Sequence, residues 1–201
     1  MVGVLCFCWS TLSAQVNEGP LFKAYFGAGV TSSQISGDRL NGFDQLGFNL
    51  GLGTELQRNA QWRPRLEIIF NQLGSRKNAR PDEGDFDSYL LRLNYIQVPL
   101  TMSYLSGSTG FELGLAPGYL LSSREEDENG TVLGLGREFK DYDLGLILGI
   151  RYAFAERWEL GTRLYQSTLA VRDHTGSSTF RLNRGQYSTA IQFILRYSVS
   201  G

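Results

Sequence analysis

The residues around the histidine are the first in the sequence that could do chemistry. His174 is the only histidine and lies in the stretch RDHTGSSTF, next to Asp173 and shortly before Ser177 and Ser178. A serine nucleophile, a histidine base and an acid can transfer acyl groups when hydrogen bonds connect the three side chains. Adjacency within a glycine- and serine-rich loop does not supply that geometry. We therefore interpret His174 as a solvated loop residue.

Two acidic patterns could act as acid–base or metal sites. Asp141 and Asp143 share one face of a predicted strand, but basic side chains are available nearby, and ion pairing explains them better. The stretch REEDENGT carries consecutive oxygen ligands at Glu125, Glu126, Asp127, Glu128 and Asn129. Its spacing is not that of an EF-hand, so we interpret it as a solvated acidic loop tip. Because zinc-ligand spacing and phosphate-binding glycine loops are also missing from the sequence, we expect no catalytic residue, no metal and no cofactor.

Composition favours a single β-rich domain. The 201 residues carry a formal net charge of -1 and a pI of about 5.9, which gives no basis for nucleic-acid binding. Mean hydropathy is -0.19, and no apolar run approaches the roughly 18 residues that a membrane helix requires. The 24 glycines and 12% aromatic residues favour many short strands, some of them crowded on one face.

The first residues, MVGVLCFCWSTLSAQ, predict a secretion signal over 1–14. A short apolar run is followed by Ser13 and Ala14, which predicts cleavage after Ala14, although no Lys or Arg precedes the run. Both cysteines, Cys6 and Cys8, lie in this segment, and neither fits a lipoprotein site. The remaining domain, 15–201, is therefore expected to contain neither disulfides nor thiol chemistry.

Past residue 14, apolar residues take every second position in eight segments. The segments cover roughly 21–32, 46–57, 62–73, 89–104, 110–122, 139–154, 157–170 and 186–199. Their connections alternate in length: SSQISGDRLNGFD, GSRKNARPDEGDFDS, SREEDENGTVLGLGRE and VRDHTGSSTFRLNRG are long, and RNAQ, LSGST and AE are short. This alternation is typical of outer-membrane barrels, which have extended external loops and tight periplasmic turns.

The composition of the two strand faces predicts which of them meets lipid. Large apolar residues from Tyr142 to Phe154 alternate with Asp143, Gly145 and Arg151, and the other segments follow the same pattern. Roughly forty bulky side chains would overfill the inside of an eight-stranded barrel, whereas the small and polar set fits there. The sequence therefore predicts an all-β fold, an eight-stranded antiparallel up-and-down transmembrane β-barrel with four long external loops and three short periplasmic turns. A soluble barrel carrier is the alternative, and the loop asymmetry and face polarity argue against it.

The polar face predicts a bore closed by ion pairs. The charged residues expected to face inward are Lys23, Glu55, Arg65, Glu67, Glu112, Asp141, Asp143, Arg151, Glu159, Arg163 and Arg196. Their signs are nearly balanced, and opposite charges with hydrogen bonds can be held in a narrow space. Eight strands enclose room for side chains only, so we expect no open diffusion pore.

Aromatic residues on the apolar face fall at two levels. Beside the short turns lie Phe22, Trp62, Tyr104, Phe111, Phe154, Trp158 and Tyr197, and near the long loops lie Tyr119, Tyr142 and Tyr187. Rings at the two water–lipid boundaries form the aromatic girdles of membrane barrels. The fourth segment fits less well, because Leu91, Leu93 and Tyr95 are out of phase with the apolar residues that follow. Either a bulge shifts the register, or this half stands above the membrane.

The stretch LRLNYIQVPLTMSY resembles the PorT-type outer-membrane β-barrel family, the Bacteroidetes outer membrane protein beta-barrel domain. The matching residues are Asn94, Tyr95, Ile96, Val98, Pro99, Leu100 and Tyr104, while Gln97 and Ser103 replace the usual acid and Lys. YDLGLILGIRYAF and RWELGTRLYQS resemble the family's sixth and seventh strands. The resemblance implies an outer-membrane location and a role like that of the founding members, which are accessory components of a protein secretion system. It provides no catalytic residue to carry over.

The leading expectation is a non-enzymatic outer-membrane barrel, envelope-structural or accessory to protein export, that contacts a protein partner through its external loops. Its other expected partner is outer-membrane lipid, with no nucleic acid and no evident small-molecule substrate. The alternative is a small lipid-modifying enzyme on the same barrel, similar to lipid A deacylases or acyltransferases and using His174.

Overall fold

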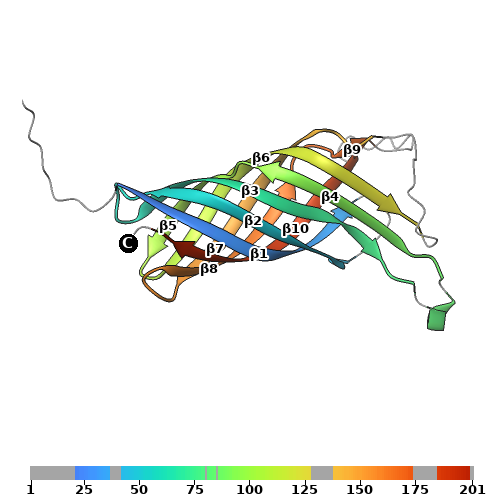
Figure 1. Ribbon diagram of the computed structural model, residues 1–201, viewed down its shortest axis with the longest axis horizontal. Coiled ribbons are helices and arrows are strands. Elements are labelled where there is room, and N and C mark those ends of the chain that lie inside the picture. The colour runs from blue at the N-terminus through green and yellow to red at the C-terminus, as the bar shows by residue number, and fades with distance from the viewer. Residues whose placement is uncertain are drawn as a thin grey trace, which may run out of the picture.

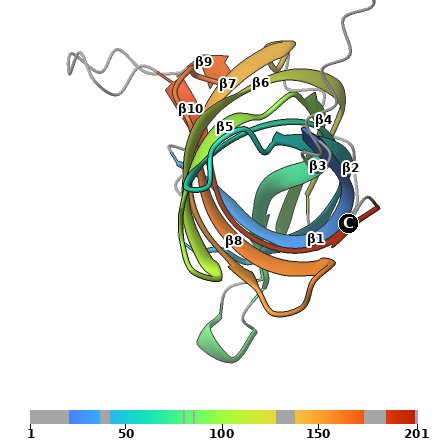
Figure 2. The ribbon, with the colours of Figure 1, turned by 90° about the vertical axis from the view of Figure 1, so that its left-hand side faces the viewer.

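The computed structural model describes residues 21–36, 42–79, 81–84, 86–127, 138–173 and 185–199, whose strands form one antiparallel sheet (Figure 1). The strands are β1 Phe22–Ser36, β2 Gln45–Leu56, β3 Trp62–Lys77, β4 Tyr89–Gln97, β5 Leu100–Ser106, β6 Thr109–Glu126, β7 Tyr142–Ala153, β8 Trp158–Ser167, β9 Arg172–Asp173 and β10 Gly185–Ser198. β1 pairs with both β2 and β10, which closes the sheet into a ring (Figure 2). The predicted antiparallel up-and-down barrel is confirmed.

The barrel has eight strand positions around its ring, as the sequence predicts, and we call each position a stave. β4 and β5 follow one another between β3 and β6 and together make one stave, interrupted at Val98 and Pro99. Proline has no N–H to donate to the ladder. Around it, Val98 N donates to Pro117 O at 2.8 Å and Glu67 N donates to Pro99 O at 3.0 Å, so the stave stays attached on both sides. β9 is a two-residue strand that pairs with β10 at the rim.

The two ends of the barrel differ in their connections (Figure 1). At one end, called the turn end, residues 57–61, 107–108 and 154–157 join neighbouring strands. Gly107 has a φ of 61°, which glycine adopts without a steric penalty in so tight a turn. The opposite end, called the loop end, carries the longer connections, including the 3-10 turn η1 Pro81–Glu83. Within the described ranges, no helix is long and apolar enough to cross a membrane.

Large apolar side chains cover the outside of the barrel. Leu46 is 72% exposed, Leu52 69% and Ile68 59%, and the residues that alternate with them are more buried. Along β6, this apolar face extends from Phe111 to Leu121, about 25 Å in height for a rise of ~3.3 Å per residue and a strand tilt of ~40°. That height equals the apolar band of outer-membrane barrels, so the orientation inferred from the sequence is correct.

The fourth stave keeps one constant inward face. Leu91 and Leu93 are fully buried in the bore, whereas Arg92 between them is exposed. The register shift lies in the partner strand β6, where Leu121 is an extra residue in the β4–β6 ladder. The bulge therefore leaves the alternation of β4 intact. The outer apolar face of the barrel, which we call the apolar belt, ends below the loop-end half of β4. This half therefore has polar residues such as Arg92 on its outer face.

Inward side chains fill the bore at three levels, from charged groups at the turn end through amides to an apolar cluster at the loop end. The apolar cluster consists of Ile35, Leu73, Leu91, Leu93, Tyr95, Ala116, Ile147, Tyr165 and Ala190. One close approach requires glycine. A Cβ on Gly145 would lie 2.0 Å from Cε2 of Tyr165, so the ring can cross the bore only where β7 has no side chain.

Candidate functional site: the charged bore

Eight charged side chains from six staves meet inside the barrel near the turn end, and we call them the bore cluster. They are four arginines and four glutamates: Arg65, Arg151, Arg163, Arg196, Glu55, Glu67, Glu112 and Glu159. All eight were predicted to face inward. Because the two signs occur in equal number, the formal charges cancel.

Arg65 on β3 links three strands. Its Nε lies 2.7 Å from Glu55 Oε2, its Nη1 lies 3.0 Å from Glu112 Oε1, and its Nη2 lies 2.8 Å from Glu159 Oε2. The ring of Tyr25 on β1 lies against the guanidinium, with 5.0 Å between the ring centroid and Cζ. Each nitrogen of one buried side chain thus has an acceptor, which is the arrangement that a desolvated arginine requires.

Arg163 and Arg196 complete the other side of the bore cluster. Arg163 is fully buried, pairs with Glu67, and places Nε 2.9 Å from Glu112 Oε2. Arg196 on β10 places Nη1 2.9 Å from Glu159 Oε1 and Nε 3.6 Å from Glu67 Oε1. The closing strand β10 is therefore tied to β3 and β8 through side chains inside the ring as well as through the backbone ladder with β8.

The bore cluster blocks the inside of the barrel. Arg151 completes it by pairing with Glu55 and with Glu159, whose Oε2 lies 3.1 Å from Nη1. Moving an unpaired charge out of water costs several kcal/mol, so each member depends on its partners. With every carboxylate held by arginines, the arrangement offers no nucleophile and no free acid or base. The bore cluster is thus a neutral set of ion pairs that occupies the bore near the turn end.

Above the bore cluster, amide and hydroxyl side chains form a hydrogen-bonded chain across four staves. Asn49 Nδ2 donates to Thr31 Oγ1 at 3.0 Å, and Thr31 Oγ1 donates to Asn71 Oδ1 at 3.1 Å. Asn71 Nδ2 then donates to Gln97 Oε1 at 2.9 Å. All four side chains are buried. The bore is therefore occupied at this level as well.

Three of the residues predicted to form interior ion pairs lie outside the bore cluster. Asp141 is exposed, because it precedes β7, so its assignment to the interior was wrong. Asp143 is buried, but it accepts hydrogen bonds from Tyr165 Oη at 2.6 Å and from Ser167 Oγ, and the described residues give it no ion pair. Lys23 lies at the turn-end mouth, where Nζ donates to the Glu156 carbonyl at 3.4 Å, and is not part of the bore cluster.

A second buried ion pair lies at the loop end. Arg172 on β9 places Nη1 3.1 Å from Glu125 Oε1 and Nη2 3.0 Å from Oε2, and its Cζ lies 4.4 Å from the centroid of the Phe139 ring. Tyr89 Oη also donates to Glu125. Interpreting Glu125 as part of a solvated loop tip was therefore wrong. The bulge at Leu121 turns Glu125 inward, and the sequence carries no signal for a bulge at that residue.

The predicted turn-end girdle residues lie on the outer face. Trp62 packs on Tyr104 with ring centroids 5.0 Å apart, and Trp158 packs on Tyr197 at 4.9 Å. Phe22, Phe111 and Phe154 are exposed there as well. Near the loop end, Tyr119 and Tyr142 form a third pair at 5.4 Å.

The residues on which the catalytic alternative depends lie outside the part of the chain that the structure describes. His174, Ser177 and Ser178 lie in the undescribed range 174–184, as do residues 1–14 of the predicted signal at the other end of the chain. Glu128 and Asn129 of the acidic stretch are also outside it. Within the described ranges, no group of His, Cys, Asp or Glu could hold a metal ion.

Solved outer-membrane barrels have a similar fold. Neisserial surface protein A, NspA, aligns with a TM-score of 0.52 and 13% identity, covering 87% of this chain and 96% of that one. Ail, the attachment invasion locus protein of Yersinia pestis, aligns with a TM-score of 0.50 and 12% identity, covering 88% and 97%. At such low identity these similarities show the fold alone. No curated protein matches the chain.

A family model of the outer membrane protein beta-barrel domain matches residues 14–168, most of the chain. The match runs from just before the predicted domain start to the residue after β8, and so contains seven of the eight staves. The remaining stave, β10, is placed by its pairing with β1 and β8. The chain therefore belongs to the outer membrane protein beta-barrel domain family and is located in the outer membrane.

Proposed function

We propose that the protein is a non-enzymatic, closed barrel that anchors its long loops at the outer face of the membrane, where they bind a protein partner. The partner takes part in envelope maintenance or in protein export. The observation that carries the proposal is the filled bore. Ion pairs, amides and apolar side chains occupy successive levels of it, which leaves the ends of the barrel as the surfaces available for binding.

The closed bore predicts a lack of conductance. Purified protein in planar bilayers should give no steady, porin-like current, because a solute would have to displace the buried ion pairs between Arg65 and Glu112 and between Arg163 and Glu112. A large steady current carried by the intact chain would contradict the proposal.

Partner binding is tested by site-specific crosslinking in intact cells. Asp82 lies on η1 at the loop end, and Ala60 lies in a turn at the opposite end; both are exposed. We expect a photo-crosslinker on Asp82→Cys to capture one defined protein, and the same crosslinker on the matched control Ala60→Cys not to capture it. Equal capture from both ends, or none from either, would count against a loop-end partner. Loss of exported proteins in a deletion strain would assign that partner to export rather than to envelope maintenance.

The non-enzymatic part of the proposal is tested at His174. If this residue is a solvated loop histidine, cells that carry only His174→Ala should have lipid A of unchanged mass and acylation. If it is the base of a lipid-modifying enzyme, the mass spectrum should show one acyl chain gained or lost, and the proposal fails.

A further inference from the structure

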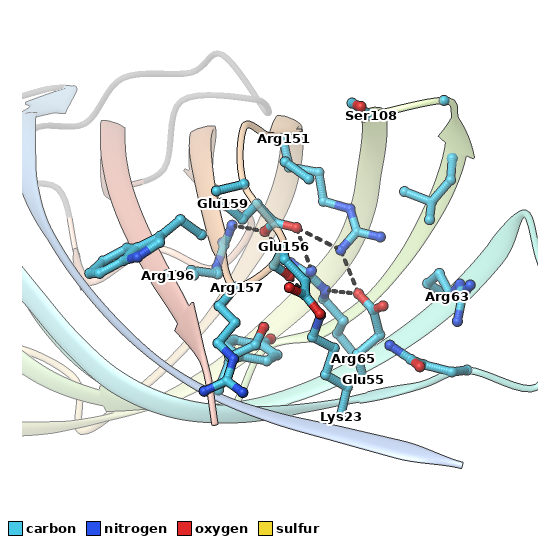
Figure 3. Close-up of a pocket in the computed structure, with 18 residues that line it drawn as sticks. Lys23, Glu55, Arg63, Arg65, Ser108, Arg151, Glu156, Arg157, Glu159 and Arg196 are labelled. Atoms are coloured by element: carbon cyan, nitrogen blue, oxygen red, sulfur yellow. Dashed lines mark hydrogen bonds and ion pairs between the residues drawn. The ribbon is translucent and has the colours of Figure 1, made fainter. Parts of the chain in front are cut away.

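A pocket of about 190 Å³ opens at the turn end against the bore cluster (Figure 3). Its deeper wall includes Arg65, Arg151 and Arg196, whose charges are balanced by Glu55, Glu112 and Glu159. This wall is therefore close to neutral, and the charge of the pocket is decided by the residues at its mouth.

The mouth of the pocket carries an excess of positive charge. Lys23, Arg63 and Arg157 line it together with a single carboxylate, Glu156 (Figure 3). The contacts found for two of these cations are weak and to uncharged groups. Lys23 Nζ lies 3.4 Å from a backbone carbonyl, and Arg157 Nη1 lies 3.4 Å from Tyr197 Oη. Because Glu156 balances only one of these three cations, the mouth keeps an excess of positive charge and favours an anion.

Several buried donors around the pocket also lack an acceptor. Arg63 Nε and Nη1, Arg151 Nε and Tyr25 Oη are buried atoms to which the described residues offer no hydrogen-bond partner. Arg151 is 3% exposed and Tyr25 5%, and both line the pocket. Buried donors in proteins almost always have an acceptor, so the wall of the pocket holds donors that the carboxylates lining it do not satisfy.

We propose that this pocket binds a phosphate group. A phosphate offers three or more acceptor oxygens to the donors of the pocket, and guanidinium groups match it in both charge and shape. Trp158 lines the pocket and also belongs to the turn-end girdle, which places the site at the level of the lipid headgroups. The phosphate is presented either by a phospholipid headgroup or by a soluble molecule on the turn-end side of the membrane.

Binding is measured on the full chain, folded in maltoside micelles at constant ionic strength. One titration uses inorganic phosphate, and another uses short-chain phosphatidylglycerol. Arg63→Gln should weaken binding by roughly tenfold to a hundredfold, because one charge-assisted contact is lost. Arg157→Gln should weaken it less, since this side chain is exposed at the rim. Arg58→Gln is the matched control, because Arg58 is an exposed arginine in the 57–61 turn and does not line the pocket.

The two titrations separate the possible sources of the phosphate. Arg63-dependent binding of both probes indicates a site for the phosphate group itself, and such binding of the lipid alone indicates a headgroup site. If neither probe binds the wild-type chain, or if both bind Arg63→Gln and Arg157→Gln as tightly as wild type, the proposal is overturned. Folding of each variant is checked by its heat-dependent mobility on gels, and Arg157→Gln carries the test if Arg63→Gln does not fold.

Discussion

The turn-end and loop-end halves of the barrel have opposite polarity. In the turn-end half of β3, Arg65 and Glu67 are buried in the bore while Ile68 is 59% exposed on the outside. In the loop-end half of the same strand, Leu73 is fully buried and Arg76 is exposed. The first half resembles a membrane barrel, and the second resembles a water-soluble one.

The backbone does not account for this difference. β3 pairs with β4 and β5 on one side, with a break only opposite Val98 and Pro99, and its residues alternate between the faces without interruption from Arg65 to Leu73. What changes along the strand is the medium outside, from lipid to water. Next to lipid, the outside must be apolar and the bore can hold paired charges. Next to water, the apolar residues move inside, as the hydrophobic effect requires.

The largest expected effect comes from breaking the charge balance of the turn-end half. Arg163→Leu leaves Glu67 and Glu112 short of one partner each, and should lower the free energy of unfolding by about 3–5 kcal/mol. Urea titration in lipid vesicles, followed by tryptophan fluorescence, measures this. The double variant Arg163→Leu with Glu67→Leu restores equal numbers of each sign and should recover most of the loss. A double variant less stable than the single one would show that the pairing is not what holds this half together.

The apolar cluster of the loop-end half is tested on adjacent residues of β4. Leu93 is fully buried in the cluster, so Leu93→Ala should lower the free energy of unfolding by about 2–5 kcal/mol. Arg92 lies next to it on the exposed face, and Arg92→Ala should change stability by no more than about 0.5 kcal/mol. Equal effects at the two positions would mean that this half does not have an apolar interior.

A charge on the outer face locates the boundary between the halves. Leu50 is 55% exposed on the apolar belt, and Leu50→Arg should cost about 2–4 kcal/mol in vesicles, because it places a charge in lipid. Ser36 is exposed at the loop end of β1, and Ser36→Arg should be nearly neutral. If Ser36→Arg is as costly as Leu50→Arg, the membrane extends further towards the loop end than the polarity of the strands indicates.

The turn-end half could be predicted from the sequence almost in full. Where large apolar residues alternate strictly with charged ones in a small barrel, only the apolar set can face outward. The number of staves, the outward face and the eight members of the bore cluster could all be predicted from this alternation. Asp141 was misassigned because alternation gives the side on which a residue lies but not the residue at which a strand begins.

The loop-end half was harder to predict, for a physical reason. There the apolar residues point inward, so the same alternation places the apolar residues on the opposite face. The sequence could not decide whether Leu91 and Leu93 follow a break in register or stand above the membrane, and the structure shows them buried in the bore. The pair of Glu125 and Arg172 depends on a bulge in β6 and on a two-residue strand. Neither has a periodic signal, because both are set by contacts between segments far apart in the sequence.

The smallest expected effect concerns the aromatic pairs that border the membrane half. Trp62 and Tyr104 are cross-strand partners with ring centroids 5.0 Å apart, so a double-mutant cycle of Trp62→Ala and Tyr104→Ala should give a coupling of about 0.5–1.5 kcal/mol. Tyr119 and Tyr142 form the equivalent pair near the loop end, at 5.4 Å, and should give a similar coupling. Both couplings should be retained in bilayers whose thickness matches the belt and should change in thinner ones, because the rings are then displaced from the headgroup region. If the coupling energies do not change with bilayer thickness, the rings contribute only as residues that favour strands. The membrane boundary then lies elsewhere on the barrel.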